Sequence, residues 1–246
     1  MTAVSGAVDS LGFLATLEGL PEQLTAAHAE AGKLDLARMP RPDEVDNIVV
    51  MGMGGSGIVG DVALAVGTAT LPVPIVVLKY FRTPAFVGPR TLAFAVSYSG
   101  DTEETLEMTR GALAAGARVV TISCGGELAR LAQEHGLLHV SCPPGLMPRA
   151  AIGALVAPVF VLLFRMGMLP EAHAGLVKAQ EQLARRRDRC KPAVTGAANP
   201  ARELARHIGR TIPIMLIDEA EAVDDAEHTR LMAKADADDV LPTFEA

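Results

Sequence analysis

The chain has 246 residues, enough for one α/β domain or two small domains, and half of them are apolar. Its net charge of −7 and the lack of a long basic stretch argue against nucleic acid as a main partner. Aromatic residues are few and Trp is absent, so the core must be built from aliphatic side chains.

Cysteine usage and hydropathy predict a cytoplasmic protein without a metal site or a membrane partner. The cysteines at 124, 142 and 190 are odd in number and lack CxxC spacing, which is typical of a reducing compartment. The first residues lack a basic start followed by an apolar core, so we expect no signal peptide. The most apolar stretch, 150–164, contains Pro158 and is shorter than the roughly 20 residues that cross a bilayer, which favours a buried helix.

The chain is predicted to begin with a helical segment, 1–38. Residues 9–31 have the pattern of one or two helices that break near Gly19. Their leucines recur at helical spacing and are expected to pack on the outside of the next domain: Leu11, Leu14, Leu17 and Leu20. The proline-rich residues 39–42 indicate a linker.

Residues 39–168 alternate between short apolar runs and helical stretches. The predicted strands are 47–51, 74–78, 91–96, 118–122 and 137–140. Helices are expected between them, with an apolar helix at 150–168 after the last strand. This alternation indicates a parallel sheet that is covered on both faces. We therefore predict an α/β fold, specifically a flavodoxin-like, doubly wound, parallel five-stranded sheet.

The rest of the chain is predicted to leave this sheet through a bridging helix and linker, 169–198. The Arg run at 185–187 on this helix is interpreted as a solvated face. A final segment, 199–246, holds a short helix, a strand near 212–217 and an acidic end, and is predicted to be an incomplete C-terminal unit.

A glycine turn links the first predicted strand to a helix, within the run NIVVMGMGGSGIVGD at 47–61. Glycine lets the backbone adopt positive φ and lets an anion approach the main chain closely. The start of a helix adds unpaired N–H groups and the positive end of the dipole, and Ser56 adds a hydroxyl. This combination is suited to binding a phosphate or another anion.

Several glycine-turn types compete for this segment. The dinucleotide fingerprint GxGxxG fits formally, but it needs an acidic residue after the next strand, where Lys79 and Tyr80 stand. A P-loop needs Lys before its Ser or Thr, and the turn has no Lys. A sugar-phosphate loop remains, beside the alternative that the glycines serve packing alone.

A second loop, SYSGDT at 97–102, also leads from a strand into a helix. It offers the hydroxyls of Ser97, Ser99 and Thr102, with Thr102 predicted as the N-cap. Ligands of open α/β sheets bind outside the carboxyl ends of strands, where both loops would lie. Alone, this loop is better interpreted as an ordinary capping box after a strand, whereas the two loops together favour a pocket for one phosphate. Glu103 and Glu104 would then serve the helix dipole.

Three segments, GMGGSGIVGD, SYSGDTEET and PPGLMPRAAIGALVAP, resemble the bifunctional phosphoglucose/phosphomannose isomerases, a branch of the sugar isomerase (SIS) domain family. The resemblance covers about 39–168. It implies a chain of two SIS domains, a homodimer, a sugar-phosphate site between domains, and no metal or nucleotide cofactor. It places the phosphate on five residues: Gly55, Ser56, Ser97, Ser99 and Thr102.

The same resemblance gives Arg149 a catalytic role, in which it stabilises an enediolate-like anion near the sugar. From the residues alone, Arg149 would be a surface arginine after a proline-rich turn. Asp101 stands where the family usually has Asn. Its carboxylate would weaken phosphate binding if it faced inward, although Asp is equally acceptable as a turn residue.

Isomerisation of glucose 6-phosphate or mannose 6-phosphate to fructose 6-phosphate moves a proton between C1 and C2, and needs a base and an acid. The resemblance assigns these to Glu, His and Lys of a second SIS domain, whose motifs match no segment after about 215. The candidates by residue type alone are predicted to be structural or solvated: Glu203, His207, Glu219, His228 and Lys234. The sequence thus leaves open an isomerase-type protein or a single-SIS sugar-phosphate-binding or regulatory module. A nucleotide-cofactor enzyme is the weakest hypothesis.

Overall fold

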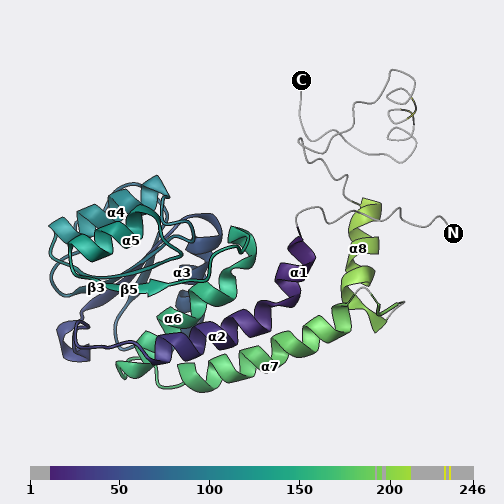
Figure 1. Ribbon diagram of the computed structural model, residues 1–246, viewed down its shortest axis with the longest axis horizontal. Helices are drawn as coiled ribbons and strands as arrows, with labels where there is room; N and C mark the ends of the chain where they lie inside the picture. The colour runs from purple at the N-terminus through teal and green to yellow at the C-terminus, as the bar shows by residue number, and fades with distance from the viewer. Residues whose placement is uncertain (1–11, 192, 196–197, 212–229, 231–232, 234–246) are drawn as a thin grey trace. The chain divides into compact units, whose positions relative to one another are not determined.

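The computed structural model describes residues 12–191, 193–195, 198–211, 230 and 233 (Figure 1). The chain divides into two compact units, Met1–Asp188 and Arg189–Ala246. The strand expected at 212–217 lies outside the described residues, as does most of the acidic end. The finer division into 1–38, 39–168, 169–198 and 199–246 stays a prediction.

A parallel sheet forms the centre of the first unit. Its strands are β1 (Asn47–Met51), β2 (Ile75–Leu78), β3 (Thr91–Val96), β4 (Arg118–Ser123) and β5 (Leu138–Ser141). They pair in the order β2-β1-β3-β4-β5, and every pair is parallel. This order confirms the predicted flavodoxin-like sheet. The strand bounds agree with the sequence to within one residue, because aliphatic runs flanked by turn residues mark buried parallel strands.

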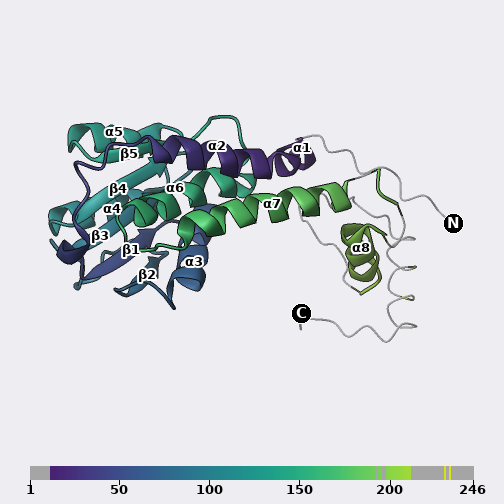
Figure 2. The ribbon, with the colours of Figure 1, turned by 90° about the horizontal axis from the view of Figure 1, so that it is seen from below.

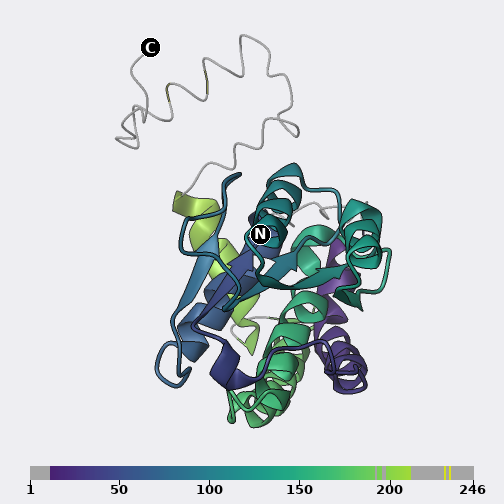
Figure 3. The ribbon, with the colours of Figure 1, turned by 90° about the vertical axis from the view of Figure 1, so that its left-hand side faces the viewer.

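Two helical layers cover the sheet, and the strand residues alternate between them. One face packs on α2 (Leu20–Gly32), α3 (Gly54–Gly67) and α6 (Ile152–Arg165), as Ile48, Val50 and Phe94 show. The other face, with Val49, Met51 and Ala93, packs on α4 (Glu103–Ala114) and α5 (Gly126–Glu134). Figure 1 shows α4 and α5 above the strands and α6 and α2 below them, and Figures 2 and 3 show these layers from two other sides.

The apolar stretch is a buried helix, as predicted. It forms the short η2 (Pro148–Ala150) and then α6, which lies between the sheet and α2. At its end Arg165 donates hydrogen bonds to the carbonyls of Ala31 and Leu34, at 3.2 and 2.6 Å. None of the helices in the described part of the chain has both the length and the apolarity needed to cross a membrane.

The N-terminal helices are α1 (Phe13–Glu18) and α2, and they break at Gly19 as expected. The predicted packing is wrong for Leu14 and Leu17, which are 52% and 39% exposed. Contact with α6 is made from α2 instead, where Leu20 and Leu24 pack closely on Gly153. Leu11 lies outside the described residues.

The long polar helix is α7 (Ala172–Cys190), and it is followed by α8 (Pro200–Thr211). The interpretation of its Arg run as a solvated face is wrong for Arg187. The side chain of Arg187 is 24% exposed and binds the carboxylate of Glu22 on α2 at 2.6 Å. A tertiary ion pair of this kind cannot be seen from charge spacing along one helix.

Candidate functional site

The two predicted anion loops lie side by side. β1 pairs with β3 up to the register Met51–Ala95, so the loops that follow these strands are neighbours. The connection from β1 runs toward β2, and that from β3 runs toward β4, so the two loops diverge at the switch point of the sheet. Ligands of doubly wound sheets bind in the crevice at this place.

The first loop turns at Gly54, whose φ is +50°, and α3 begins there. A Cβ on Gly55 would lie 3.1 Å from the carbonyl oxygen of Pro148 and 3.6 Å from Cα of Arg149. The lack of a side chain thus lets η2 approach the loop. The first N–H groups of α3 have no partner within the helix and carry the positive end of its dipole.

Serine hydroxyls in both loops accept hydrogen bonds from the backbone. The N–H of Tyr98 donates to Oγ of Ser56 at 3.2 Å and links the two loops. The N–H of Gly100 donates to Oγ of Ser97 at 3.1 Å, and that of Asp101 donates to Oγ of Ser99 at 3.3 Å. Because a hydroxyl that accepts a bond still has its own hydrogen, each of these serines can donate in turn.

Thr102 occupies the N-cap position of α4, but its hydroxyl makes no capping bond. It lies 2.9 Å from Oγ of Ser97 instead. One hydroxyl of this pair donates to the other, so the pair keeps one hydrogen for a ligand. Ser97 is 1% exposed, which fixes the pair in place.

The carboxylate of Asp101 faces the start of α5. Its Oδ1 accepts a hydrogen bond from the N–H of Glu127 at 2.8 Å. Asp101 therefore satisfies a first-turn donor of α5. The carboxylate that stands where the family usually has Asn is therefore engaged at the N-terminus of α5.

The structure places Arg149 on η2, with its backbone beside Gly55. Its side chain is exposed and makes no hydrogen bond or ion pair with any residue that the structure describes. The guanidinium is therefore not engaged by any described residue, and the backbone of Arg149 lies beside the glycine turn.

Tyr98 is a residue of this site that the sequence reasoning missed. Its phenol donates to the carbonyl of Pro143 at 2.9 Å and accepts from the N–H of Leu146 at 2.7 Å. Tyr98 is 7% exposed, and burial raises the pKa of its phenol. The only feature of the sequence that could have pointed to Tyr98 is its place between Ser97 and Ser99.

Lys79 follows β2, at the position where a dinucleotide site would carry an acid. Its ammonium binds the carboxylate of Asp61 on α3 at 2.6 Å. The end of β2 therefore offers a cation that is already paired, and no carboxylate for a ribose.

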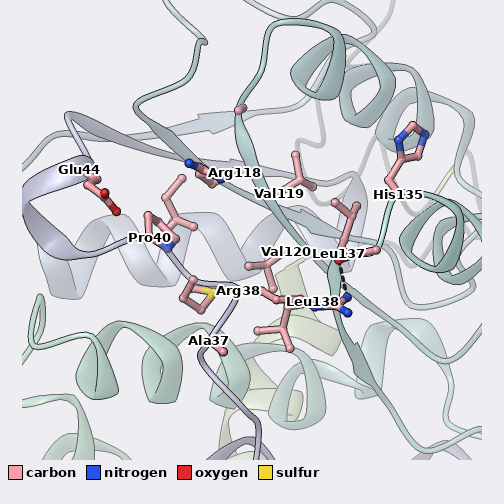
Figure 4. Close-up of a pocket in the computed structure, with 14 residues that line it drawn as sticks. Ala37, Arg38, Pro40, Glu44, Arg118, Val119, Val120, His135, Leu137 and Leu138 are labelled. Atoms are coloured by element: carbon pink, nitrogen blue, oxygen red, sulfur yellow. Dashed lines mark hydrogen bonds between the residues drawn. The ribbon is translucent and has the colours of Figure 1, made fainter.

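A cavity of about 480 Å³ lies at the opposite edge of the sheet, at the amino ends of β3, β4 and β5 (Figure 4). Arg38, Arg118 and His135 line it over a floor of aliphatic side chains. The guanidinium of Arg38 donates to the carbonyl of Gly136, which Figure 4 shows as a dashed line. This cavity is separate from the two anion loops.

The second unit contains α8, whose N-terminus is capped by Asn199. Its Oδ1 accepts from the N–H groups of Ala201 and Arg202, at 3.1 and 3.2 Å. Glu203 lies in the first turn of this helix. The side chain of His207, and the whole of Glu219, His228 and Lys234, lie outside what the structure describes.

A parallel sheet of this order, with a glycine turn and a serine-rich loop at its switch point, matches the α/β fold of SIS domains. The C-terminal domain of glucosamine-fructose-6-phosphate aminotransferase from Francisella tularensis has a similar fold, with a TM-score of 0.54. The match covers 75% of this chain and 56% of that one, at 18% sequence identity. At this identity the likeness shows the fold alone.

Sequence relatives define the family more narrowly, although no protein-family model matches the chain. A bifunctional phosphoglucose/phosphomannose isomerase from Caldicellulosiruptor bescii is 33% identical over 196 residues, which are 80% of this chain and 57% of the relative. One from Thermoplasma acidophilum is 40% identical over 125 residues, 51% of this chain and 38% of the relative. The chain belongs to this family of SIS-domain sugar-phosphate isomerases. It spans about half the length of the curated relatives that it matches.

Proposed function

We propose that the chain binds a phosphorylated sugar at the carboxyl edge of its sheet. Gly55, Ser56, Ser97, Ser99 and Thr102 would surround the phosphate. The observation that carries this proposal is the orientation of the hydroxyls, which accept backbone N–H bonds and keep hydrogens to donate. The N-termini of α3 and α4 add backbone donors at the same place.

The magnitudes favour an anion with several oxygens. A hydrogen bond to a charged group contributes about 1.5–3 kcal/mol. Ser56, Ser99 and the Ser97–Thr102 pair can each supply one such bond to a different phosphate oxygen. The carboxylate of Asp101 is held at α5, so repulsion by this group is reduced.

The proposed reaction is the isomerisation of glucose 6-phosphate or mannose 6-phosphate to fructose 6-phosphate. The guanidinium of Arg149 would stabilise the negative charge that develops on an enediolate-like intermediate. The reaction moves protons only, so it requires neither a metal nor a nucleotide cofactor. In this proposal a second SIS domain supplies the base and the acid, and the protein works as a cytoplasmic homodimer.

Calorimetric titration with fructose 6-phosphate, beside a coupled isomerase assay, tests the proposal. The matched control carries Ser56→Ala and Ser99→Ala, which remove two hydroxyls and change no charge. Binding and turnover that are both lost in this variant would support an isomerase. Binding without turnover, lost in the variant, would support the phosphate site and point to a binding or regulatory module. Absence of binding would overturn the proposal.

A further inference from the structure

Tyr98 connects three segments that are far apart in the sequence. Its backbone N–H donates to Ser56 in the first loop, and its backbone carbonyl accepts from Cys124 after β4, at 2.9 Å. Its phenol binds both Pro143 and Leu146, which follow β5. The residue between the two serines of the second loop is thus a common attachment point for the loops at this edge.

The segment bound by the phenol leads directly to Arg149. Leu146 is three residues before Arg149, and the turn of η2 that contains Arg149 is closed by the hydrogen bond from Ala150 N–H to Met147 O, at 2.8 Å. Prolines at 144 and 148 fix φ within this stretch, which limits the ways it can rearrange. The hydrogen bond to Leu146 therefore restricts the position of η2, and with it the position of Arg149.

The hydroxyl of Tyr98, and not the ring alone, makes this attachment. One oxygen donates to a carbonyl and accepts from an N–H at the same time, which an aromatic ring without a hydroxyl cannot do. The phenol is neutral at physiological pH, because the ordinary pKa of tyrosine is about 10 and burial raises it further, so the hydrogen that binds Pro143 is retained. Within η2, the carbonyl of Pro148 approaches α3 closely, which Gly55 allows because it has no side chain. The segment is held between these two contacts.

We propose that Tyr98 is a positioning residue whose phenol sets the place of Arg149 relative to the phosphate loops. This role rests on the proposed function. The serine hydroxyls hold the phosphate whether or not the phenol is present, while the contact of Arg149 with the sugar depends on the Tyr98 hydroxyl. Tyr98 acts through Arg149 and does not itself touch the sugar.

A double-mutant cycle tests this dependence at pH 7.5, with Tyr98→Phe, Arg149→Ala and the double variant titrated by calorimetry. We expect each single variant to weaken fructose 6-phosphate binding by roughly tenfold, and the double variant to bind no more weakly than Arg149→Ala. Inorganic phosphate, which lacks the sugar, should bind Tyr98→Phe within about twofold of the wild type. Tyr80→Phe is the matched control, since it removes the hydroxyl of an exposed tyrosine.

Additive effects in the cycle, or equal losses for inorganic phosphate and fructose 6-phosphate, would overturn the positioning role. Amide exchange at Leu146 and tryptic cleavage after Arg149 test the attachment without any ligand. Both rates should rise in Tyr98→Phe by about tenfold and stay unchanged in Tyr80→Phe. Unchanged rates in Tyr98→Phe would also overturn the role. A wild type that binds no fructose 6-phosphate would overturn the proposed function and this role with it, even where the exchange data establish the attachment.

Discussion

The two edges of the sheet differ in the groups that they present to an anion. The carboxyl edge offers serine hydroxyls and the N-termini of α3 and α4. The amino edge offers a cavity of about 480 Å³ with Arg38 and Arg118 on its wall. If an anion site were assigned from arginines beside a large cavity alone, it would be assigned to the amino edge.

The helix dipoles argue against that choice. α4 ends at Ala114 and α5 at Glu134, so their last carbonyls, with partial negative charge, lie toward the amino edge. Arg38 donates to the carbonyl of Gly136, two residues past the end of α5, so the positive charge of Arg38 is already held close to this C-terminus. The comparison teaches that the direction of the backbone dipoles, and not cavity size or arginine count, is the feature that favours the carboxyl edge as the proposed anion site.

The largest expected effect on the proposed function is on ligand affinity. Ser97→Ala removes a buried hydroxyl that binds Thr102 and Gly100 N–H. We expect fructose 6-phosphate to bind this variant about 10- to 100-fold more weakly, because a bond to a charged group is lost. Calorimetry measures the change. Arg38→Ala and Arg118→Ala, at the opposite edge, are the controls and should stay within about twofold of the wild type. A larger loss in the arginine variants would reverse the comparison.

The next prediction concerns stability, and it compares the free energy of unfolding of two Gly→Ala variants. Gly100, at the carboxyl edge, has φ of +85°, and a Cβ there would lie 2.0 Å from the carbonyl oxygen of Gly125. Gly136, at the amino edge, has φ of +62°, and its nearest neighbour, Nη1 of Arg38, would be 3.6 Å away. We expect Gly100→Ala to lower the free energy of unfolding by about 3 kcal/mol, from strain and clash together.

Gly136→Ala should lower it by about 1 kcal/mol, from backbone strain alone. Urea denaturation at a common pH measures both variants. Equal losses would mean that the second loop can shift away from Gly125, and that the tight packing inferred at the carboxyl edge is wrong.

A smaller effect concerns Asp101. Asp101→Ala removes the acceptor for the N–H of Glu127 and should lower the free energy of unfolding by about 1 kcal/mol. Asp101→Asn keeps an acceptor oxygen and should cost less. Both variants should bind fructose 6-phosphate within about twofold of the wild type, because the carboxylate faces α5. Affinity that rises tenfold in Asp101→Asn would show that the carboxylate faces the phosphate instead.

The smallest effect is a dependence of stability on pH. Burial lowers the pKa of His28 and of His139, and His173 lowers that of His28 further. Between the lowered folded-state pKa and the unfolded value of about 6.5, the unfolded chain binds more protons than the folded chain. The free energy of unfolding should therefore fall as the pH drops below about 6.5 and level off below the folded-state pKa.

Denaturation of the wild type and of His28→Gln across pH 5 to 7.5 measures this slope. The slope should be smaller in the variant, because one of the two perturbed histidines is gone. An unchanged slope would assign the effect to other groups. At pH 7.5 these histidines are predominantly neutral in both states, so the measurements on variants of the two sheet edges hardly include the effect of their protonation.

The sequence by itself determined the fold class and the composition of the candidate site. Apolar runs at β1 and β3, each followed by a turn and a helix start, predicted both loops and their common edge. These features are local, since strand, turn and cap preferences act within a few residues. Gly55, Ser56, Ser97, Ser99 and Thr102 were found in this way, or by a resemblance carried by the same short motifs.

Only the tertiary structure decided which groups the site residues contact. Thr102 faces Ser97 and makes no side-chain capping bond, Asp101 faces α5, and Arg187 binds Glu22 across two helices. The phenol of Tyr98 meets Leu146, 48 residues further along the chain. Such contacts depend on how strands order themselves in the sheet and on how closely backbones approach at glycines. The physical reason is that periodicity specifies which face of an element is buried, whereas the partner of a polar group is fixed only when distant segments pack together.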